Sequence, residues 1–173
     1  MDKYWIIGSS SGIGKALAKK LDNKGYKLIL SSRSEDKLNE LNSLLNNAHE
    51  VLPFDLSDKD QCLSVSQQIV ESNPDSLNII FMSAAYNPDD YSDYENIINV
   101  NIMGFMHILH VTIKFMINST NKSKLIICSS LVAYKGLPYS QPYSMTKAAL
   151  YNLASSLHLS LIHISEPTRQ LCI

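Results

Sequence analysis

Several features are scarce in this sequence of 173 residues, and each scarcity narrows the classes of function it can serve. Its three cysteines, Cys62, Cys128 and Cys172, are odd in number and far apart, which indicates unpaired thiols in a reducing cytosol rather than a disulfide framework. The net charge is −1 and the lysines are scattered, so the sequence gives no signal for nucleic acid. The five histidines show no metal-ligand spacing, and we expect no metal.

Long apolar runs and an N-terminal leader are also missing. The chain enters a strand pattern at residue 4, which leaves no room for a signal peptide, and no apolar run approaches a membrane span. We therefore expect a cytoplasmic protein that does not bind a membrane. Because 45% of the residues are hydrophobic, one domain with a sizeable core is expected.

Glycine is infrequent, yet three of the six glycines fall in the turn at residues 8–14, Gly-Ser-Ser-Ser-Gly-Ile-Gly. The turn follows the apolar residues 4–7 and opens a helical pattern in which Ile13, Leu17 and Leu21 recur every fourth residue. A strand, a glycine turn and a helix N-terminus together form an anion site, because the first N–H groups of the helix are unpaired. The turn predicts a pyrophosphate site, and a loop that binds nothing is the alternative.

Short apolar segments alternate with helical patterns along the chain. We expect strands near residues 4–7, 27–32, 51–54, 77–82 and 125–128, and helices that include one over 95–118 and one over 141–157. In the helix after Ser34, a predicted N-cap, the expected buried stripe is Leu38, Leu41, Leu44 and Leu45. The pattern predicts a single α/β domain with a Rossmann-like, doubly wound parallel sheet. Ligands of such sheets lie at the carboxyl ends of the strands, where Gly8, Arg33, Asp55, Ser83 and Ser130 fall.

Tyr143 and Lys147 are four residues apart on the last predicted helix, and so lie one turn apart on the same face. A fixed ammonium beside a phenol favours the phenolate and lowers the phenol pKa, which suits acid/base chemistry. Taken alone, this spacing equally describes a solvated helix face. Ser130, 13 residues before Tyr143, and Asn101 in the long helix accompany the pair.

With these residues together, the sequence resembles the short-chain dehydrogenase/reductase family from the glycine turn to about residue 158. The resemblance implies hydride transfer between a nicotinamide cofactor and a small-molecule carbonyl or alcohol, with Tyr143 as general acid/base. It implies that Ser130 hydrogen-bonds the substrate oxygen and that Lys147 holds the ribose and lowers the Tyr143 pKa. Asn101 would anchor a proton-relaying water, with Asn99 as a competing position. Ser129 competes with Ser130, and the spacing favours Ser130.

The resemblance also implies the cofactor contacts. The expected positions are Gly8, Ser10, Ser11, Gly12, Ile13, Gly14, Ser32, Arg33, Asp55, Leu56, Ala84, Tyr143 and Lys147. Arg33 follows the second strand where a binder of NAD(H) places a carboxylate, which favours NADP(H) over NAD(H). Asp55 matches the position that meets the adenine edge.

Two positions depart from the family pattern. Ile7 stands where a threonine is usual, and residues 82–85, Met-Ser-Ala-Ala, replace Asn-Asn-Ala-Gly. The second change puts in doubt the side-chain contacts that steady this loop. It keeps open an alternative function, a non-catalytic dinucleotide-binding protein that senses redox state.

The last residues do not continue the resemblance. The eleven residues 159–169 match the in-frame translation of a transposon-end sequencing adapter, so we interpret 1–158 as a truncated domain and 159–173 as a non-native tail. The substrate-specificity loop is then missing and the fragment itself is expected to be inactive. Apolar residues around the long helix and the last helix predict that the parent protein is a homo-oligomer.

Overall fold

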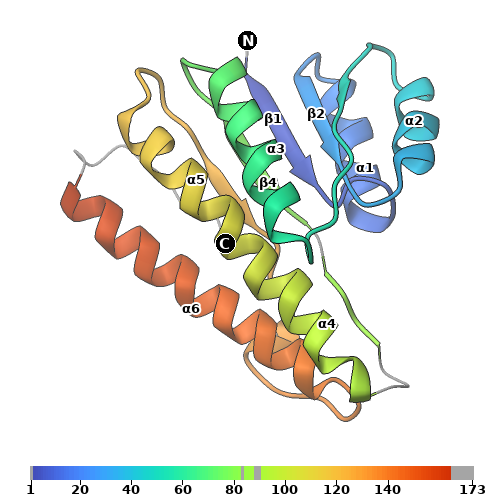
Figure 1. Ribbon diagram of the computed structural model, residues 1–173, viewed down its shortest axis with the longest axis vertical. Helices are drawn as coiled ribbons and strands as arrows, with labels where there is room; N and C mark the ends of the chain where they lie inside the picture. Colours follow the sequence, from blue (N-terminus) through green and yellow to red (C-terminus); the bar gives the residue numbers. More distant parts are fainter. Residues whose placement is uncertain (1, 83, 88–90, 165–173) are drawn as a thin grey trace.

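The computed structural model describes residues 2–82, 84–87 and 91–164, and its centre is a parallel β-sheet (Figure 1). Within these residues the sheet has five strands in the order β3-β2-β1-β4-β5. The strands are β1 (Lys3–Ile7), β2 (Lys27–Ser31), β3 (Glu50–Val51), β4 (Asn78–Phe81) and β5 (Leu125–Ile127). All four strand pairings are parallel, which confirms the predicted doubly wound fold.

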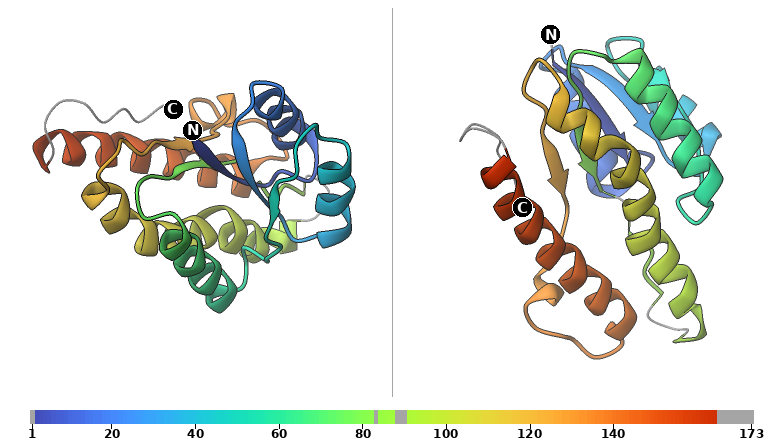
Figure 2. Two further views of the ribbon diagram at one scale, coloured as in Figure 1. Left: turned by 90° about the horizontal axis from the view of Figure 1, so that it is seen from above. Right: turned by 60° about the vertical axis from the view of Figure 1, so that its left-hand side comes forward.

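Helices cover both faces of the sheet (Figure 2). Alternate residues of β1 point to opposite faces: Trp5 and Ile7 join one buried cluster, and Tyr4 and Ile6 join the other. The first cluster receives side chains from α3 (Lys59–Ser72), α5 (Gly104–Asn118) and α6 (Gln141–Ile164). The second receives side chains from α1 (Gly12–Asp22) and α2 (Glu35–Ser43). The central residues of β1, β2 and β4 are therefore apolar and buried, because helices cover both faces of the sheet there.

The buried stripe of α1 differs from the sequence prediction. Gly14, Ala18 and Asp22 are buried, whereas Ile13 is 68% exposed and Leu17 and Leu21 are only partly buried. The reason lies in the turn, where Gly14 packs directly on the Gly8 backbone and so directs its own side of the helix inward.

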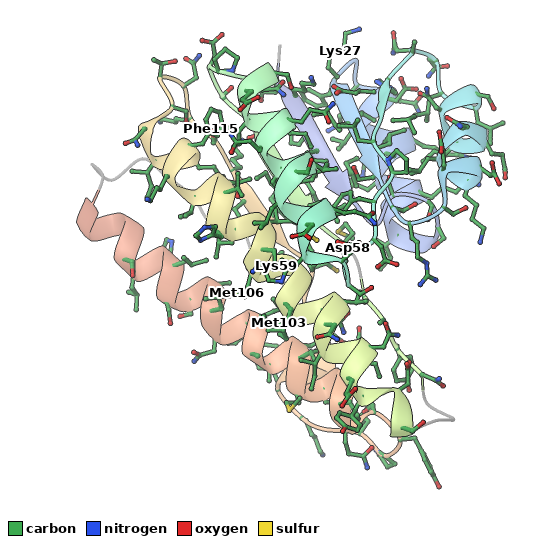
Figure 3. All side chains as sticks on the ribbon, in the orientation of Figure 1. Lys27, Asp58, Lys59, Met103, Met106 and Phe115 are labelled. Atoms are coloured by element: carbon green, nitrogen blue, oxygen red, sulfur yellow. The ribbon has the colours of Figure 1, made fainter. Side chains whose placement is uncertain are left out.

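The stripe of α2 is also shorter than predicted. Leu38 and Leu41 are buried, but Leu44 is 57% exposed because the helix ends at Ser43. The predicted N-cap is confirmed, since the Ser34 hydroxyl accepts a hydrogen bond from the Lys37 N–H. Asp58 caps α3 in the same way through the Gln61 N–H at 3.0 Å, and Figure 3 labels Asp58 and Lys59 at this end of the helix.

The predicted helix over 95–118 is continuous but irregular. It comprises α4 (Tyr94–Ile98), the π-helical turn η2 (Asn99–Met103) and α5. The stretch Tyr94–Asn118 is apolar and long enough to span a membrane by length and composition, so the prediction that no run approaches a span is wrong for it. Its buried residues Phe105, Ile108 and Met116 pack in the core, and core helices of globular domains meet the same criterion.

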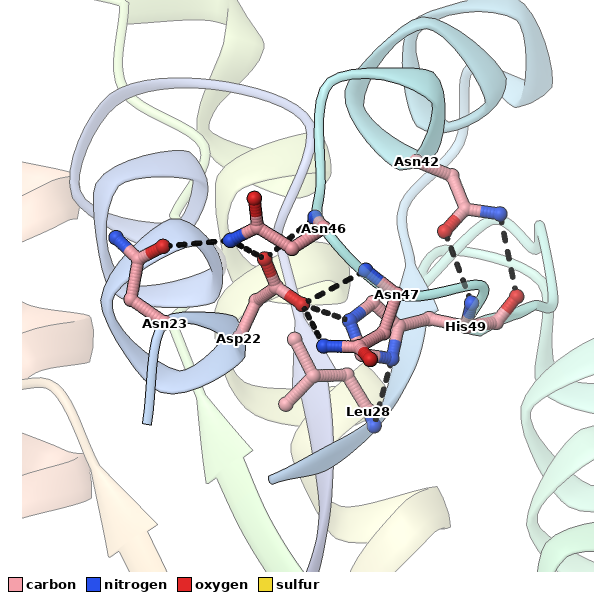
Figure 4. A network of polar contacts seen from close by, with 7 residues as sticks. All are labelled: Asp22, Asn23, Leu28, Asn42, Asn46, Asn47 and His49. Atoms are coloured by element: carbon pink, nitrogen blue, oxygen red, sulfur yellow. Dashed lines mark hydrogen bonds and ion pairs between the residues drawn. The ribbon is translucent and has the colours of Figure 1, made fainter. Parts of the chain in front are cut away.

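A buried polar network ties α1 to the segment before β3 (Figure 4). The Asp22 carboxylate accepts hydrogen bonds from the backbone and side-chain N–H groups of Asn46 and Asn47, at 2.8–3.2 Å. His49 Nε2 lies 3.0 Å from Asp22 Oδ1, and His49 Nδ1 accepts from the Leu28 N–H at 3.3 Å. Nδ1 acts as an acceptor, so the neutral ring with its proton on Nε2 satisfies both contacts. Burial raises the Asp22 pKa, but these hydrogen bonds outweigh it and lower the pKa to about 2.

Candidate dinucleotide and catalytic site

A cavity of about 570 Å³ lies at the carboxyl ends of the strands. Its lining includes every predicted cofactor position except Tyr143 and Lys147: Gly8, Ser10, Ser11, Gly12, Ile13, Gly14, Ser32, Arg33, Asp55, Leu56 and Ala84. Residues from four separate strand ends meet there because parallel strands finish at the same edge. Ser83, also expected at this edge, lies outside the described residues.

The glycine turn is held tightly against β2. The N–H groups of Gly8 and Ser9 both donate to the Ser31 carbonyl oxygen, at 2.8 and 3.1 Å. A Cβ on Gly14 would collide with the Gly8 carbonyl, whereas Gly12 has a φ of +51° and faces open space. The Ser11 side chain makes no capping hydrogen bond to α1. The turn thus presents backbone N–H groups and the positive end of the helix dipole to the cavity.

Arg33 is an exposed side chain at the rim of the cavity, next to Ser32 and just beyond β2. It forms no ion pair with the residues that the structure describes. Asp55 lies in the same lining, where its carboxylate accepts from the Ser57 N–H at 2.9 Å and from the Ser57 hydroxyl at 2.7 Å. The Arg33 guanidinium after β2 is therefore available to bind an anion, and the Asp55 carboxylate after β3 is held in place by Ser57.

Asn101 holds the altered loop after β4. Its Oδ1 accepts from the Ala85 N–H at 2.7 Å, and its Nδ2 donates to the Ala85 carbonyl at 3.0 Å. The same Nδ2 lies 3.0 Å from the Thr146 hydroxyl oxygen on α6, and the Asn101 side chain is completely buried. The loop is thus steadied through its backbone, which explains how it tolerates Met82 and Ala85 in place of the family residues.

Ser130, Tyr143 and Lys147 meet beside β5. The Ser130 side chain contacts the Tyr143 phenol by a hydrogen bond and accepts from the Val132 N–H at 3.4 Å. Ser129 instead donates to the Lys147 carbonyl oxygen at 3.2 Å. The structure thus places Ser130, rather than its neighbour, against the phenol, as the 13-residue spacing indicates.

Lys147 is 1% exposed, and its ammonium donates to the Cys128 carbonyl oxygen at 2.9 Å. Its Nζ lies 5.6 Å from the centre of the Tyr143 ring. Burial lowers the pKa of Lys147.

The predicted lowering of the Tyr143 pKa is wrong for this structure. Burial of the phenol raises its pKa, the hydrogen bond with Ser130 opposes the rise, and the nearby Cys128 and Tyr86 add to it. The Lys147 ammonium, which donates to the Cys128 carbonyl oxygen, is not among the groups that shift the Tyr143 pKa. The phenol is therefore protonated at neutral pH.

Sequence reasoning missed Tyr86. Its ring lies 4.9 Å from the Tyr143 ring, centre to centre, with the two planes tilted by 47°. It also lines the cavity and is 50% exposed. No motif contains Tyr86, and the sole hint in the sequence is its place just after a strand end.

Comparison with known proteins identifies the relatives of this chain. The family model described as short chain dehydrogenase matches residues 3–164. An uncharacterized oxidoreductase of Staphylococcus epidermidis is 28% identical over 162 residues, which is 90% of this chain and 70% of that protein. A 3-oxoacyl-[acyl-carrier-protein] reductase of Rickettsia prowazekii is 29% identical over 88% of this chain and 63% of that protein. The chain thus spans about two thirds of the length of these curated relatives.

The fold matches solved structures as well. A metagenomic short-chain oxidoreductase in complex with NADP superimposes with a TM-score of 0.87 at 20% identity, covering 98% of this chain and 78% of that one. The family match reaches residue 164, and α6 continues to the same residue, so both extend beyond the limit of about 158 expected from the sequence. Residues 165–173 lie outside the described part of the chain.

Proposed function

Because this chain belongs to the short-chain dehydrogenase family, we propose that the protein is an NADP(H)-preferring oxidoreductase acting on a small carbonyl or alcohol compound. One observation carries this proposal: the cavity lined by the glycine turn, Arg33 and Asp55 is also lined by Tyr86, whose ring packs on Tyr143. When bound, the dinucleotide supplies the hydride chemistry.

The residues beside β5 supply the proton chemistry. Since Tyr143 is protonated at neutral pH, its hydroxyl can donate a proton to a carbonyl oxygen during reduction. Ser130 holds the same oxygen by a second hydrogen bond and orients it. Lys147 would hold the ribose hydroxyls and Asn101 would anchor a water for proton exchange. Asn101 would bind this water through its backbone, because its side-chain amide already forms hydrogen bonds with Ala85 and Thr146.

The preference for NADP(H) rests on the end of β2. Ser32 and Arg33 line the cavity where a carboxylate would accept from the 2′-hydroxyl of NAD(H). A guanidinium suits a 2′-phosphate because it can form two charge-assisted hydrogen bonds. The metagenomic relative described above was solved with NADP, which supports the assignment by analogy.

The test separates binding from turnover. NADPH and NADH titrations of this chain, followed by cofactor fluorescence, measure binding. A panel of carbonyl compounds with the protein encoded by the complete reading frame measures turnover. We expect tighter binding of NADPH, and turnover that Tyr143→Phe abolishes while binding persists. Binding without turnover across the panel would favour the alternative, a redox-sensing dinucleotide binder, which the altered residues 82–85 keep open.

We further propose that the protein is a homo-oligomer. Met103 and Met106, labelled in Figure 3, are 41% and 39% exposed on η2 and α5, and Met145 on α6 is 53% exposed. Exposed apolar side chains on two long helices favour burial against a second copy. Light scattering at micromolar concentration tests this, and a monomer would contradict it.

A further inference from the structure

Tyr86 touches both halves of the proposed site. Its side chain lines the cavity that also holds the glycine turn and Arg33, whereas Ser130, Tyr143 and Lys147 are not part of that lining. Its ring also packs on Tyr143, at 4.9 Å between centres. This half-exposed ring therefore links the dinucleotide cavity to the catalytic phenol.

The backbone next to Tyr86 is held by the Asn101 amide, which also contacts α6. Ala85, the residue before Tyr86, is held through both its N–H and its carbonyl by Asn101. Asn101 Nδ2 also contacts Thr146, and the Thr146 hydroxyl donates to the Tyr143 carbonyl oxygen at 2.8 Å. A short chain of buried and partly buried hydrogen bonds thus connects the backbone beside Tyr86 to the backbone of Tyr143.

On the basis of the proposed function, we infer that Tyr86 is a substrate-positioning residue that selects carbonyl compounds carrying a flat aromatic or conjugated group beside the carbonyl. The substrate oxygen must lie within hydrogen-bond distance of the Tyr143 and Ser130 hydroxyls. The group next to the carbonyl then lies close to the half-exposed Tyr86 ring, which packs on Tyr143. A flat group can pack on that ring in the offset or tilted geometries that aromatic pairs prefer.

The segment that follows Ser130 in the chain is rich in exposed apolar side chains. The segment that joins Ser130 to α6 carries large exposed apolar side chains, namely Leu131, Tyr134, Leu137 and Tyr139, with exposed fractions of 54–85%. A branched aliphatic group can make apolar contacts, but it cannot pack on the Tyr86 ring as a second ring would. Tyr86 is therefore the residue expected to discriminate between flat and branched groups.

Tyr86 also acts through Tyr143, because its ring shields the phenol from water. The other groups that face the phenol are Ser130, by its hydrogen bond, and Cys128 and Lys147 beside the ring. Removing the Tyr86 ring should let water reach the phenol and lower its pKa, while the Phe replacement should keep the shielding.

The first experiment compares an aryl ketone with a branched aliphatic ketone of equal carbon number, using the protein encoded by the complete reading frame. Tyr86→Phe should keep the ratio of the two kcat/KM values. Tyr86→Ala should reduce the preference for the aryl ketone by about two- to twelvefold, the range expected for one aromatic pair. The matched control is Tyr94→Ala, at a tyrosine on α4 that is 48% exposed. It should leave the ratio of the two kcat/KM values unchanged. A ratio unchanged in Tyr86→Ala overturns the inference.

The second experiment needs no activity. The phenol of Tyr143 in this chain is titrated by ultraviolet absorbance, as the difference from Tyr143→Phe, in the Tyr86, Tyr86→Phe and Tyr86→Ala proteins. A lower pKa in Tyr86→Ala alone supports the contact, and an unchanged pKa overturns it. If no carbonyl compound is turned over, the proposed function fails, while this titration still reports whether Tyr86 shields Tyr143.

Discussion

Replacement of Asp22 by Asn tests the buried network of Figure 4 quantitatively. The Asp22 pKa falls from 3.8 to about 2 on folding. At about 1.4 kcal/mol for each pKa unit, this fall corresponds to about 2 kcal/mol of stability. Because the folded pKa is the lower one, the contribution is complete above pH 3.8 and is lost as the pH falls through 2. We therefore expect Asp22→Asn to lose about 2 kcal/mol at pH 7.

The pH dependence of this loss is the stronger test. Linkage predicts that about half of the difference between the two proteins remains at pH 3. Urea unfolding can be followed by the fluorescence of Trp5, the one tryptophan of the chain, which is completely buried in β1. Asp75→Asn, at an exposed aspartate, is the control and should cost less than about 0.5 kcal/mol. A loss in Asp22→Asn that is the same at pH 7 and pH 3 would refute the charge-based explanation.

Four further outcomes are expected. Arg33→Asp should weaken NADPH binding by about tenfold or more and leave NADH binding nearly unchanged, and equal effects on the two cofactors would show that Arg33 is a surface residue. Gly14→Ala should abolish binding of both dinucleotides, because its Cβ would collide with the Gly8 carbonyl; calorimetry detects this. The rate of carbonyl reduction should fall as the pH rises through the raised Tyr143 pKa, as a pH–rate profile would show. Amplification of the source DNA should replace residues 159–173 with a longer reading frame, and a genomic stop codon after Ile173 would contradict that interpretation.

The sequence predicts the fold well because local and global signals agree. Apolar strands that alternate with capped helices allow few arrangements besides a parallel sheet, and the caps at Ser34 and Asp58 follow from local hydrogen bonding. The details that were missed depend on contacts between distant segments. Which face of α1 is buried is set by Gly14 packing on Gly8, and the pKa of Tyr143 is set by burial that a helical spacing cannot reveal.

Some residues of the candidate site could be predicted from the sequence and others could not, for the same reason. The glycine turn and Arg33 belong to motifs that lie next to strands, so their meeting at one edge could be predicted. The side-chain bonds of Asn101 and the place of Tyr86 could not, because they join residues 45 and 57 positions apart, Asn101 to Thr146 and Tyr86 to Tyr143. Helical periodicity relates residues three or four positions apart and therefore cannot predict contacts between such distant residues.

The central place of β1 has a consequence for the synthesis of the chain. This strand, Lys3–Ile7, leaves the ribosome before both of its partners; β2 follows within about 25 residues, whereas β4 begins at Asn78. Because synthesis adds about 5–20 residues per second, the edge of β1 that pairs with β4 stays unpaired for several seconds. During that time an apolar strand with unpaired N–H and C=O groups is open to other nascent chains. Slow translation between β2 and β4 should accordingly raise the demand for chaperones on this protein.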